Sequence, residues 1–292
     1  MRSSIQFIPS GFSILKVNAF LFILGLGWLF MMGYSPFRSI LWDEALWKGL
    51  IESVLGYNWS DYVTSDLPIR MTAVLEVVFI FMLAFAGLFT WQVQIHWARW
   101  VILLTASFLV VFAIWDWRSH SWRIPQILEH AARAGSLFLI LGAFYWQWSK
   151  ARLIRISEWL IGATFVGHGL FALGWWPRPG HFVDMTILLL NCSESQAVFF
   201  LQIVGWLDLI SALIVLMQWP GTKVALWYMI IWGLATAIAR IASNYYAELA
   251  SEQLMRWLPE VLIRTPHYLL PLFVVLASGE ASNKAASNTS TG

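Results

Sequence analysis

Cysteine and charged residues are scarce in this sequence. Among its 292 residues, charged side chains account for 12%, and Cys192 is the single cysteine. One cysteine excludes an intrachain disulfide and a Cys-x-x-Cys redox pair, and we expect this thiol, close to the end of an apolar segment, to be chemically inert. The formal net charge of +2 gives no reason to expect a nucleic-acid partner.

Motifs that fix a reaction type are absent as well. The sequence holds no His-Glu-x-x-His, no cysteine–histidine cluster, no Gly-x-Ser-x-Gly and no Walker loop. It therefore predicts no metal site and no particular catalytic activity. Whether the protein is an enzyme is left open.

Hydrophobic residues dominate what is present. They make up 59% of the chain, and the mean hydropathy is +0.68, too apolar for one soluble core. Stretches of about 17 to 25 mostly apolar residues without strand-like alternation predict membrane-spanning helices. Eight such stretches cover residues 17–34, 71–91, 99–115, 131–147, 156–176, 197–219, 224–242 and 261–278. We therefore expect an all-α integral membrane protein with eight transmembrane helices.

Residues near the ends of these stretches indicate the orientation in the membrane. The 20 tryptophans gather there, where their amphipathic rings suit headgroup depth. With eight spans both termini lie on one side, where the loops are short and basic. Lysines and arginines of these loops are Arg2, Lys16, Arg99, Lys150, Arg152, Arg155 and Lys223. The opposite loops hold most of the carboxylates, although lysine and arginine alone divide almost evenly. We expect a multi-pass protein of a bacterial inner membrane with both termini in the cytoplasm.

The two long outer loops differ from each other. Residues 39–55 place charged side chains on one helical stripe and apolar side chains on the other, which predicts an amphipathic helix in the membrane interface. The corresponding loop of the second half is shorter and is interrupted by Pro177 and Pro179. We expect it to be a lid over the bundle, and a gate over a substrate site is the alternative.

Several features occur twice, in the same order. Each half has four predicted spans, with glycines in the first and an acidic residue in the second. The matched residues are Gly25 and Gly27 with Gly167 and Gly169, Glu76 with Asp208, Pro125 with Pro259, and Glu129 and Arg133 with Glu260 and Arg264. Glutamate and arginine four residues apart share a helix face, so each such pair is expected to be a structural ion pair. The pattern predicts two parallel four-helix repeats, residues 1–148 and 149–278, and a disordered tail, residues 279–292.

Two carboxylates lie inside apolar spans. A carboxylate in hydrocarbon costs about 2.5 kcal/mol or more, so it usually faces the bundle interior and has a partner or a function. One interpretation makes Glu76 and Asp208, together with His168 and Arg240, groups that bind a ligand or relay protons. The other makes each acid a structural carboxylate that is bonded within its own bundle.

His168 is a histidine within a predicted span. It is a candidate proton shuttle or, less favourably, a haem ligand. A haem would need an axial partner at the same depth, and His130 and His267 are expected near the outer ends of their spans instead. No covalently bound cofactor is expected.

Three features of each half resemble the DoxX-like family, here in duplicated form. They are the glycine-containing first helix (GLGWLFMMG and GHGLFALGWW), the acid in the second helix (LEVVF and LDLIS) and the proline-led fourth helix with Glu-x-x-x-Arg. The resemblance implies a four-helix bundle for each copy. Members of that family include the membrane subunit of a thiosulfate:quinone oxidoreductase and a protein needed for methylamine dehydrogenase maturation. This chain lacks the cysteine pair that thiol–disulfide chemistry of such relatives requires.

Three hypotheses for function follow. The first is a membrane subunit or accessory of an electron-transfer or sulfur-oxidation system that binds a quinone-like or other lipophilic molecule. Its electrons would come through other subunits of a membrane complex. The second is a transporter for a small solute or for protons, with the buried acids carrying the coupling. The third is a structural subunit that docks a larger membrane complex in the lipid bilayer.

Overall fold

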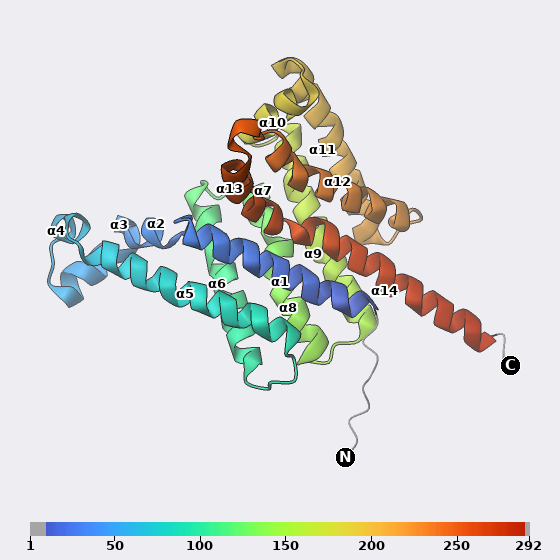
Figure 1. The fold of residues 1–292 in the computed structure, drawn as a ribbon, viewed down its shortest axis with the longest axis horizontal. Coiled ribbons are helices and arrows are strands. Elements are labelled where there is room, and N and C mark those ends of the chain that lie inside the picture. The colour runs from blue at the N-terminus through green and yellow to red at the C-terminus, as the bar shows by residue number, and fades with distance from the viewer. Residues whose placement is uncertain (1–9, 290–292) are drawn as a thin grey trace.

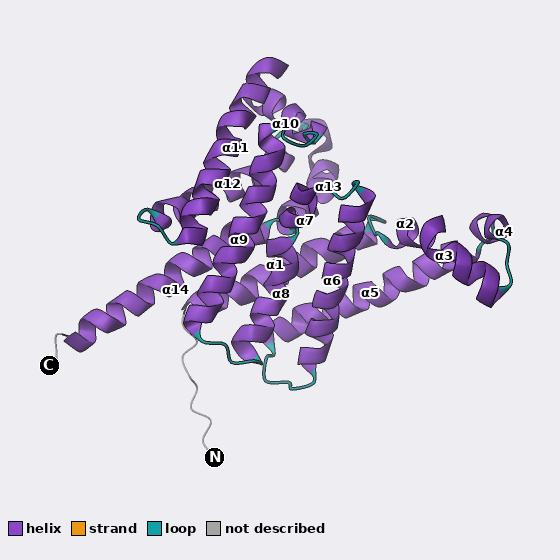
Figure 2. Ribbon diagram, turned by 180° about the vertical axis from the view of Figure 1, so that it is seen from behind, coloured by secondary structure: helices purple, strands orange, loops and turns teal. Residues whose placement is uncertain are grey.

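The computed structural model describes residues 10–289, with side chains described as far as residue 279. Every regular element in this range is a helix (Figure 1 and Figure 2). The α-helices are α1 (Ser10–Met31), α2 (Phe37–Leu41), α3 (Glu44–Leu50), α4 (Trp59–Thr64), α5 (Leu67–Trp91), α6 (Ala98–Ser119), α7 (Ile124–Glu129), α8 (Ala131–Phe144), α9 (Lys150–Leu173), α10 (Gly180–Leu190), α11 (Glu194–Met217), α12 (Thr222–Ala242), α13 (Ala250–Leu262) and α14 (Thr265–Thr289). A π-helical turn at Ile51–Leu55 and a 3-10 turn at Ala247–Leu249 complete the set.

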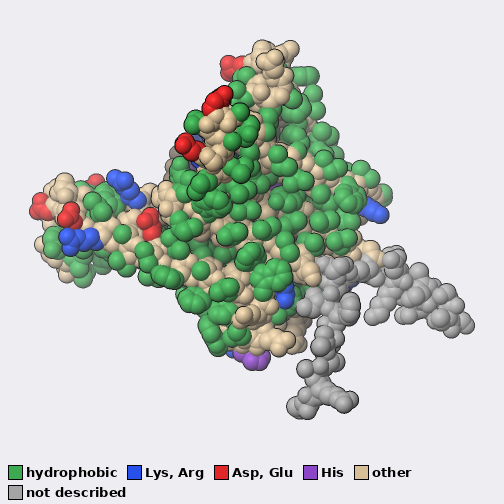
Figure 3. Space-filling view, viewed as in Figure 1, with side chains coloured by type: hydrophobic (Ala, Val, Ile, Leu, Met, Phe, Trp, Pro, Cys, Tyr) green, Lys and Arg blue, Asp and Glu red, His purple; other side chains and the backbone are tan. Residues whose placement is uncertain are grey.

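Seven of the described helical segments are long and apolar enough to cross a membrane: α1, α5, α6, α7 with α8, α9, α11 and α12. A further pair, Ala247–Leu262 and Thr265–Gly279, passes the same test together but bends by 44° at its break, so the count is eight if this pair is one span. Apolar side chains cover most of the visible face of the body (Figure 3), as a surface in contact with lipid requires. The predicted all-helical architecture is confirmed, and these helices support a multi-pass membrane protein.

Helices α1 and α9 are the central helices of the fold. Helix α1 packs against α5, α13 and α14, and α9 packs against α7, α8, α11 and α14. Glycines permit the closest approaches. A Cβ atom on Gly25 of α1 would lie 2.5 Å from Cβ of Leu262 in α13. A Cβ atom on Gly167 of α9 would lie 2.8 Å from the carbonyl oxygen of Pro125 in α7. Larger residues at either position would push these helices apart.

A break between two helices lies just before the fourth predicted span of the first half, residues 131–147, and near the start of the last predicted span, residues 261–278. Helix α7 has Pro125 in its first turn and ends at Glu129, and α8 begins at Ala131. Helix α13 contains Pro259, and α14 starts after a bend of 44°. Pro259 occupies an interior position of α13, where proline lacks the N–H that the helix requires, whereas Pro125 stands in the first turn of α7, where proline is tolerated. Both broken segments pack against α9, which places Glu129 and His267 beside that helix.

Residues 34–66 form an arm that extends from the body at the start of α5 (Figure 1). The prediction of one helix over residues 39–55 is wrong, because Asp43 interrupts it and separates α2 from α3. The Asp43 carboxylate accepts a hydrogen bond from the backbone N–H of Leu46, so it caps α3 and starts a new helix. The same carboxylate binds Arg118 of α6, with Nη1 and Oδ2 3.0 Å apart, and ties the arm to the body.

Helix α10 forms the second outer segment, where the sequence predicted a lid. It follows Pro177 and Pro179, packs against α11 and α12, and lines one side of a cavity. At the other end of the molecule, α14 continues to Thr289, through most of the tail that was predicted to be disordered. Alanine, glutamate and lysine in ASGEASNKAAS are good helix formers, so the helix of the span continues into this segment. Residues 290–292 of the tail lie outside the described residues.

Candidate functional site

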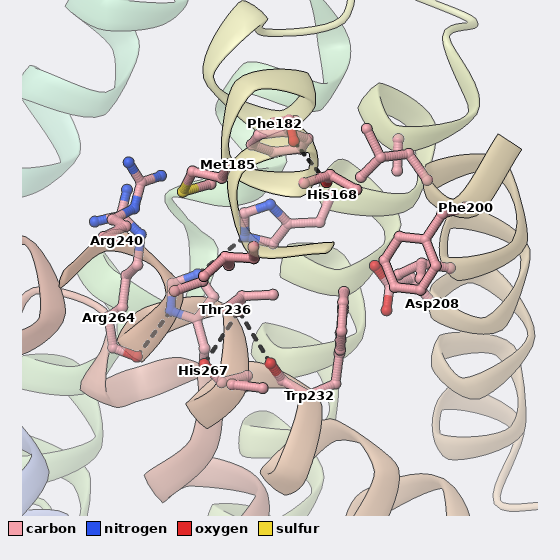
Figure 4. A pocket seen from close by; sticks show the side chains of 18 of the residues that line it. His168, Phe182, Met185, Phe200, Asp208, Trp232, Thr236, Arg240, Arg264 and His267 are labelled. Atoms are coloured by element: carbon pink, nitrogen blue, oxygen red, sulfur yellow. Dashed lines mark hydrogen bonds between the residues drawn. The ribbon is translucent and has the colours of Figure 1, made fainter. Parts of the chain in front are cut away.

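A cavity of about 220 Å³ lies between α9, α10, α11, α12 and α14 (Figure 4). Most of its wall is apolar and includes Ala172, Met185, Phe200, Val204 and Trp232. Its ionisable side chains gather at two ends. His168, His267, Arg240 and Arg264 stand at one end, and Asp208 stands at the other (Figure 4). The cavity therefore suits a largely apolar molecule with a polar head.

Close helix packing fixes His168 in the cavity wall. Gly167 lies against the backbone of α7, and a Cβ atom on Gly169 would lie 2.9 Å from the carbonyl oxygen of Gly205 in α11. Because both neighbours of His168 are packed this tightly, α9 is held between α7 and α11. Nε2 of His168 lies 3.0 Å from Nε2 of His267, which stands in the first turn of α14.

The two histidines belong to a chain of polar contacts. Nδ1 of His168 lies 2.8 Å from Oε1 of Glu129, and Nδ1 of His267 lies 3.1 Å from the carbonyl oxygen of Arg264. A carbonyl oxygen only accepts hydrogen bonds, so Nδ1 of His267 must carry a proton; when this ring is neutral, its Nε2 accepts. Nε2 of His168 must then be the donor between the two rings.

This arrangement leaves one proton to share between Glu129 and His168. With Nε2 already protonated, a neutral His168 would turn the lone pair of Nδ1 toward a carboxylate oxygen only 2.8 Å away, which is repulsive. One further proton, on Glu129 or on Nδ1 of His168, removes the repulsion. Because His168 also lines the cavity, the chain can exchange this proton with a bound molecule.

Arg240 at the end of α12 and Arg264 between α13 and α14 line this end of the cavity, and Arg133 on α8 lies near enough to His267 for their charges to interact. Nη1 of Arg264 donates to Oε2 of Glu260 at 2.6 Å, and Nη2 of Arg240 lies 3.2 Å from Nε2 of His181. Nε of Arg133 and Nε of Arg240 are buried without a hydrogen-bond partner in the described part of the chain.

His181 stands at the start of α10, outside the membrane-spanning helices. To accept from Arg240, its Nε2 must be unprotonated. Partial burial of the ring, together with the positive charges of Arg240 and Arg264, lowers the pKa of His181 to about 4. His181 is therefore neutral near pH 7 and does not add to the charge of the three arginines.

The two acids that the sequence matched have different surroundings. Asp208 is 2% exposed, lines the cavity, and accepts a hydrogen bond from the hydroxyl of Tyr228 at 2.7 Å. Glu76 is half-buried on α5 and accepts a hydrogen bond from the hydroxyl of Ser35, between α1 and α2. The structure thus brings Asp208, His168 and Arg240 together around one cavity and places Glu76 elsewhere.

The two expected ion pairs also differ. Glu260 and Arg264 form the contact described above. Glu129, by contrast, lies against His168 of α9 rather than against Arg133, because Gly167 brings α7 onto α9. Spacing along one helix identified the acid but not the competing partner on another helix.

The expectation that His168 and His267 lie at different depths is wrong, since their Nε2 atoms are 3.0 Å apart. His168 is near the C-terminal end of α9, and the bend between α13 and α14 brings the first turn of α14 to the same level. Sequence reasoning also missed the contact of His181 with Arg240. The sequence signal for the break was Pro266 in the first turn of α14, and the contact of His181 had none.

Comparison with known proteins finds no relative, because no family model, no curated protein and no solved structure matches the chain.

Proposed function

We propose that this protein binds a lipophilic molecule from the bilayer in the cavity beneath α10 and exchanges a proton with its head. One observation carries the proposal: an apolar cavity ends at His168, whose other ring nitrogen faces Glu129 at 2.8 Å. The apolar wall suits the body of such a molecule, and the Glu129–His168–His267 chain suits a head that gains or loses a proton.

A quinone is one molecule of this kind. Its carbonyl oxygens accept hydrogen bonds, and its reduction to a quinol takes up two electrons and two protons. The Glu129–His168 pair holds one such proton, and Arg240 lies at the same end of the cavity. Electrons would come from a partner, so the protein would act as the membrane subunit of an electron-transfer system, the role that a DoxX-like protein suggests.

We also propose that the two halves are copies of one four-helix unit. Helix α1 packs on α5 as α9 packs on α11, and α5 packs on α6 as α11 packs on α12. The last two helices of each half pack on the first helix of the other half. Helices α13 and α14 of the second half pack on α1, and helices α7 and α8 of the first half pack on α9. This symmetry of contacts supports the duplication.

Glycine contacts give the register of the two copies. Gly167 lies against Pro125 and Leu128, and Gly25 lies against Pro259 and Leu262. In this register Pro125 corresponds to Pro259, so Glu129 corresponds to Ile263. The Glu129–Arg133 and Glu260–Arg264 pairs are then displaced from each other by about one helical turn. The polar chain therefore belongs to only one of the two copies.

A proton transporter is the second candidate, and a specific cluster favours it. Nε2 of His130 lies 2.9 Å from Oδ2 of Asp116, whose Oδ1 lies 3.4 Å from Nδ1 of the half-exposed His120. His130 follows Glu129 in sequence, so this cluster leads from the protein surface toward the cavity. Proton flux through liposomes that contain the reconstituted protein would favour transport. Loss of that flux in Glu129→Gln would assign the proton path to the row of Glu129, His168 and His267.

Binding of a decyl-substituted benzoquinone to the purified protein tests the first candidate. We expect saturable binding that Thr236→Phe abolishes, because Thr236 lines the cavity and its side chain bonds only to the backbone of its own helix. The matched control is Ile231→Phe on the same helix, a side chain that is 66% exposed. Equal binding by both variants, each folded by gel filtration, would reject this cavity as the site.

A further inference from the structure

The charged groups at one end of the cavity do not balance. Three guanidinium groups, those of Arg133, Arg240 and Arg264, face the two carboxylates of Glu129 and Glu260. With every histidine neutral this cluster carries a net charge of +1. The proton that Glu129 and His168 share raises the net charge to +2.

In the described part of the chain, no other group that lines this end of the cavity supplies the missing negative charge. His181 accepts from Arg240 and is neutral. Asp208, the other carboxylate of the cavity wall, stands at the opposite end with Tyr228 as its partner (Figure 4). Glu260 already bonds through Oε2 to Arg264.

A partly buried positive charge without a paired carboxylate is stabilised by an anion in contact with it. Arg240 lines the cavity, and its buried Nε has no hydrogen-bond partner among the described residues. Guanidinium groups bind carboxylate and phosphate oxygens with strong, charge-assisted hydrogen bonds. The remaining wall, with Phe200, Val204 and Trp232, is mostly apolar and, among the described side chains, carries no further basic one.

We infer that the cavity takes a single-chain amphiphile with an oxyanion head, carboxylate or phosphate, placed against Arg240 and His168 with its chain along the apolar wall. The inference rests on the proposed lipophile site and adds the charge of the head. A neutral quinone satisfies the apolar wall but leaves the charge of the arginines uncompensated. An amphiphilic anion satisfies both.

Five compounds separate these ligands when they are titrated against the full chain in a mild non-ionic detergent: dodecanoate, dodecyl phosphate, dodecanol, inorganic phosphate and the decyl-substituted benzoquinone. We expect one or both amphiphilic anions to bind at least about tenfold more tightly than dodecanol, the effect of one charge-assisted hydrogen bond. Inorganic phosphate lacks the chain, so we expect it to bind at least about tenfold more weakly than dodecyl phosphate.

Variants of Arg240 assign the preference to the cavity. Arg240→Gln should remove the advantage of the anions over dodecanol, whereas Arg240→Lys should retain most of it. The matched control is Arg70→Gln, because Arg70 is 79% exposed and pairs with Asp66 on the arm side of α5. Gel filtration and the melting temperature show whether each variant is folded.

Equal affinity for dodecanol and the amphiphilic anions would overturn the inference, as would an anion preference that survives Arg240→Gln. Tight binding of inorganic phosphate would show that the ligand needs no apolar chain and would overturn the inference that it is an amphiphile. If the benzoquinone binds better than the anions, the charge of the head is wrong but the lipophile site stands. If none of the lipophilic compounds binds to folded protein, the proposed function fails as well.

Discussion

Gly167→Ala is the substitution that most directly tests how the polar chain is positioned. Gly167 precedes His168 on α9, and a Cβ atom there would lie 2.8 Å from the carbonyl oxygen of Pro125 and 3.0 Å from the backbone nitrogen of Glu129. These are backbone atoms of α7, so no side chain can rotate away. The helices would have to separate, and the contact between Glu129 and His168 would lengthen.

The size of the effect follows from these distances. Ordinary contacts of a Cβ atom begin near 3.4 Å, so α7 and α9 must part by roughly 0.6 Å at this point. Overpacking of this kind costs about 1–3 kcal/mol. Alanine also favours a helix over glycine by about 1 kcal/mol, and this gain has to be subtracted.

Gly27→Ala on α1 provides the matched control. The nearest atom to its added Cβ would be Cδ1 of Leu83 at 3.9 Å, an ordinary contact. Both substitutions carry the same gain in helix propensity, so their difference isolates overpacking at Gly167. Gly25→Ala, which would clash with α13, should behave like Gly167→Ala.

The assay is thermal unfolding in detergent at one fixed scan rate, followed by intrinsic tryptophan fluorescence. We expect Gly167→Ala to melt several degrees below Gly27→Ala, since 1 kcal/mol corresponds to roughly 2–4 °C for a chain somewhat smaller than this one. Equal melting temperatures for Gly167→Ala and Gly27→Ala would refute the close packing of α7 on α9 and, with it, the placement of Glu129 beside His168.

Three further predictions concern separate parts of the molecule. The pKa of His181 is lowered in the folded protein, so neutral His181 stabilises the fold above pH 6.5, and this contribution is lost as the pH falls toward 4. In melting experiments, His181→Gln should therefore lose less stability than wild type between pH 7 and 4.5. Asp43→Ala removes a helix cap and an ion pair, so we expect the free energy of unfolding to fall by about 1–2 kcal/mol and the arm to be cleaved faster by protease. The control Asp66→Ala removes only an exposed ion pair and should change little. Glu129→Gln removes a carboxylate from a cluster with excess positive charge and should lower the melting temperature more than Glu76→Gln, whose carboxylate contacts Ser35 in a half-buried setting.

Each of these predictions has a result that contradicts it. Parallel pH profiles for wild type and His181→Gln would mean that the ring is not held neutral. Equal proteolysis of Asp43→Ala and Asp66→Ala would mean that Arg118 does not anchor the arm. A larger loss in Glu76→Gln than in Glu129→Gln would place the important buried carboxylate in the first half.

Hydropathy was sufficient to predict the helices that can span a membrane, because length and apolar content are local properties of the sequence. The ends of the segments were less accurate: α6 extends to Ser119, beyond the predicted residue 115. In the arm, amphipathic periodicity suggested one helix, but Asp43 competes for a backbone N–H and starts a second one.

The cavity was harder to foresee, because it depends on which helices bend. Asp208, His168 and Arg240 were identified as polar residues in or near apolar spans, and they do line one cavity. The role of Glu129 was not visible from i,i+4 spacing, since its contact with His168 depends on the tertiary packing at Gly167. His168 was predicted nearer mid-membrane than His267, but it lies near the C-terminal end of α9, level with His267 in the first turn of α14.

Mass spectrometry of the molecules extracted from gently purified protein shows whether the cavity beneath α10 holds a lipophilic molecule. We expect a lipophilic molecule to co-purify with wild type and with Ile231→Phe and to be depleted from Thr236→Phe, in which the side chain fills the cavity. The identity of that molecule would separate a quinone from an amphiphilic anion. If folded Thr236→Phe carries the same bound molecules as wild type, the cavity beneath α10 is not the binding site.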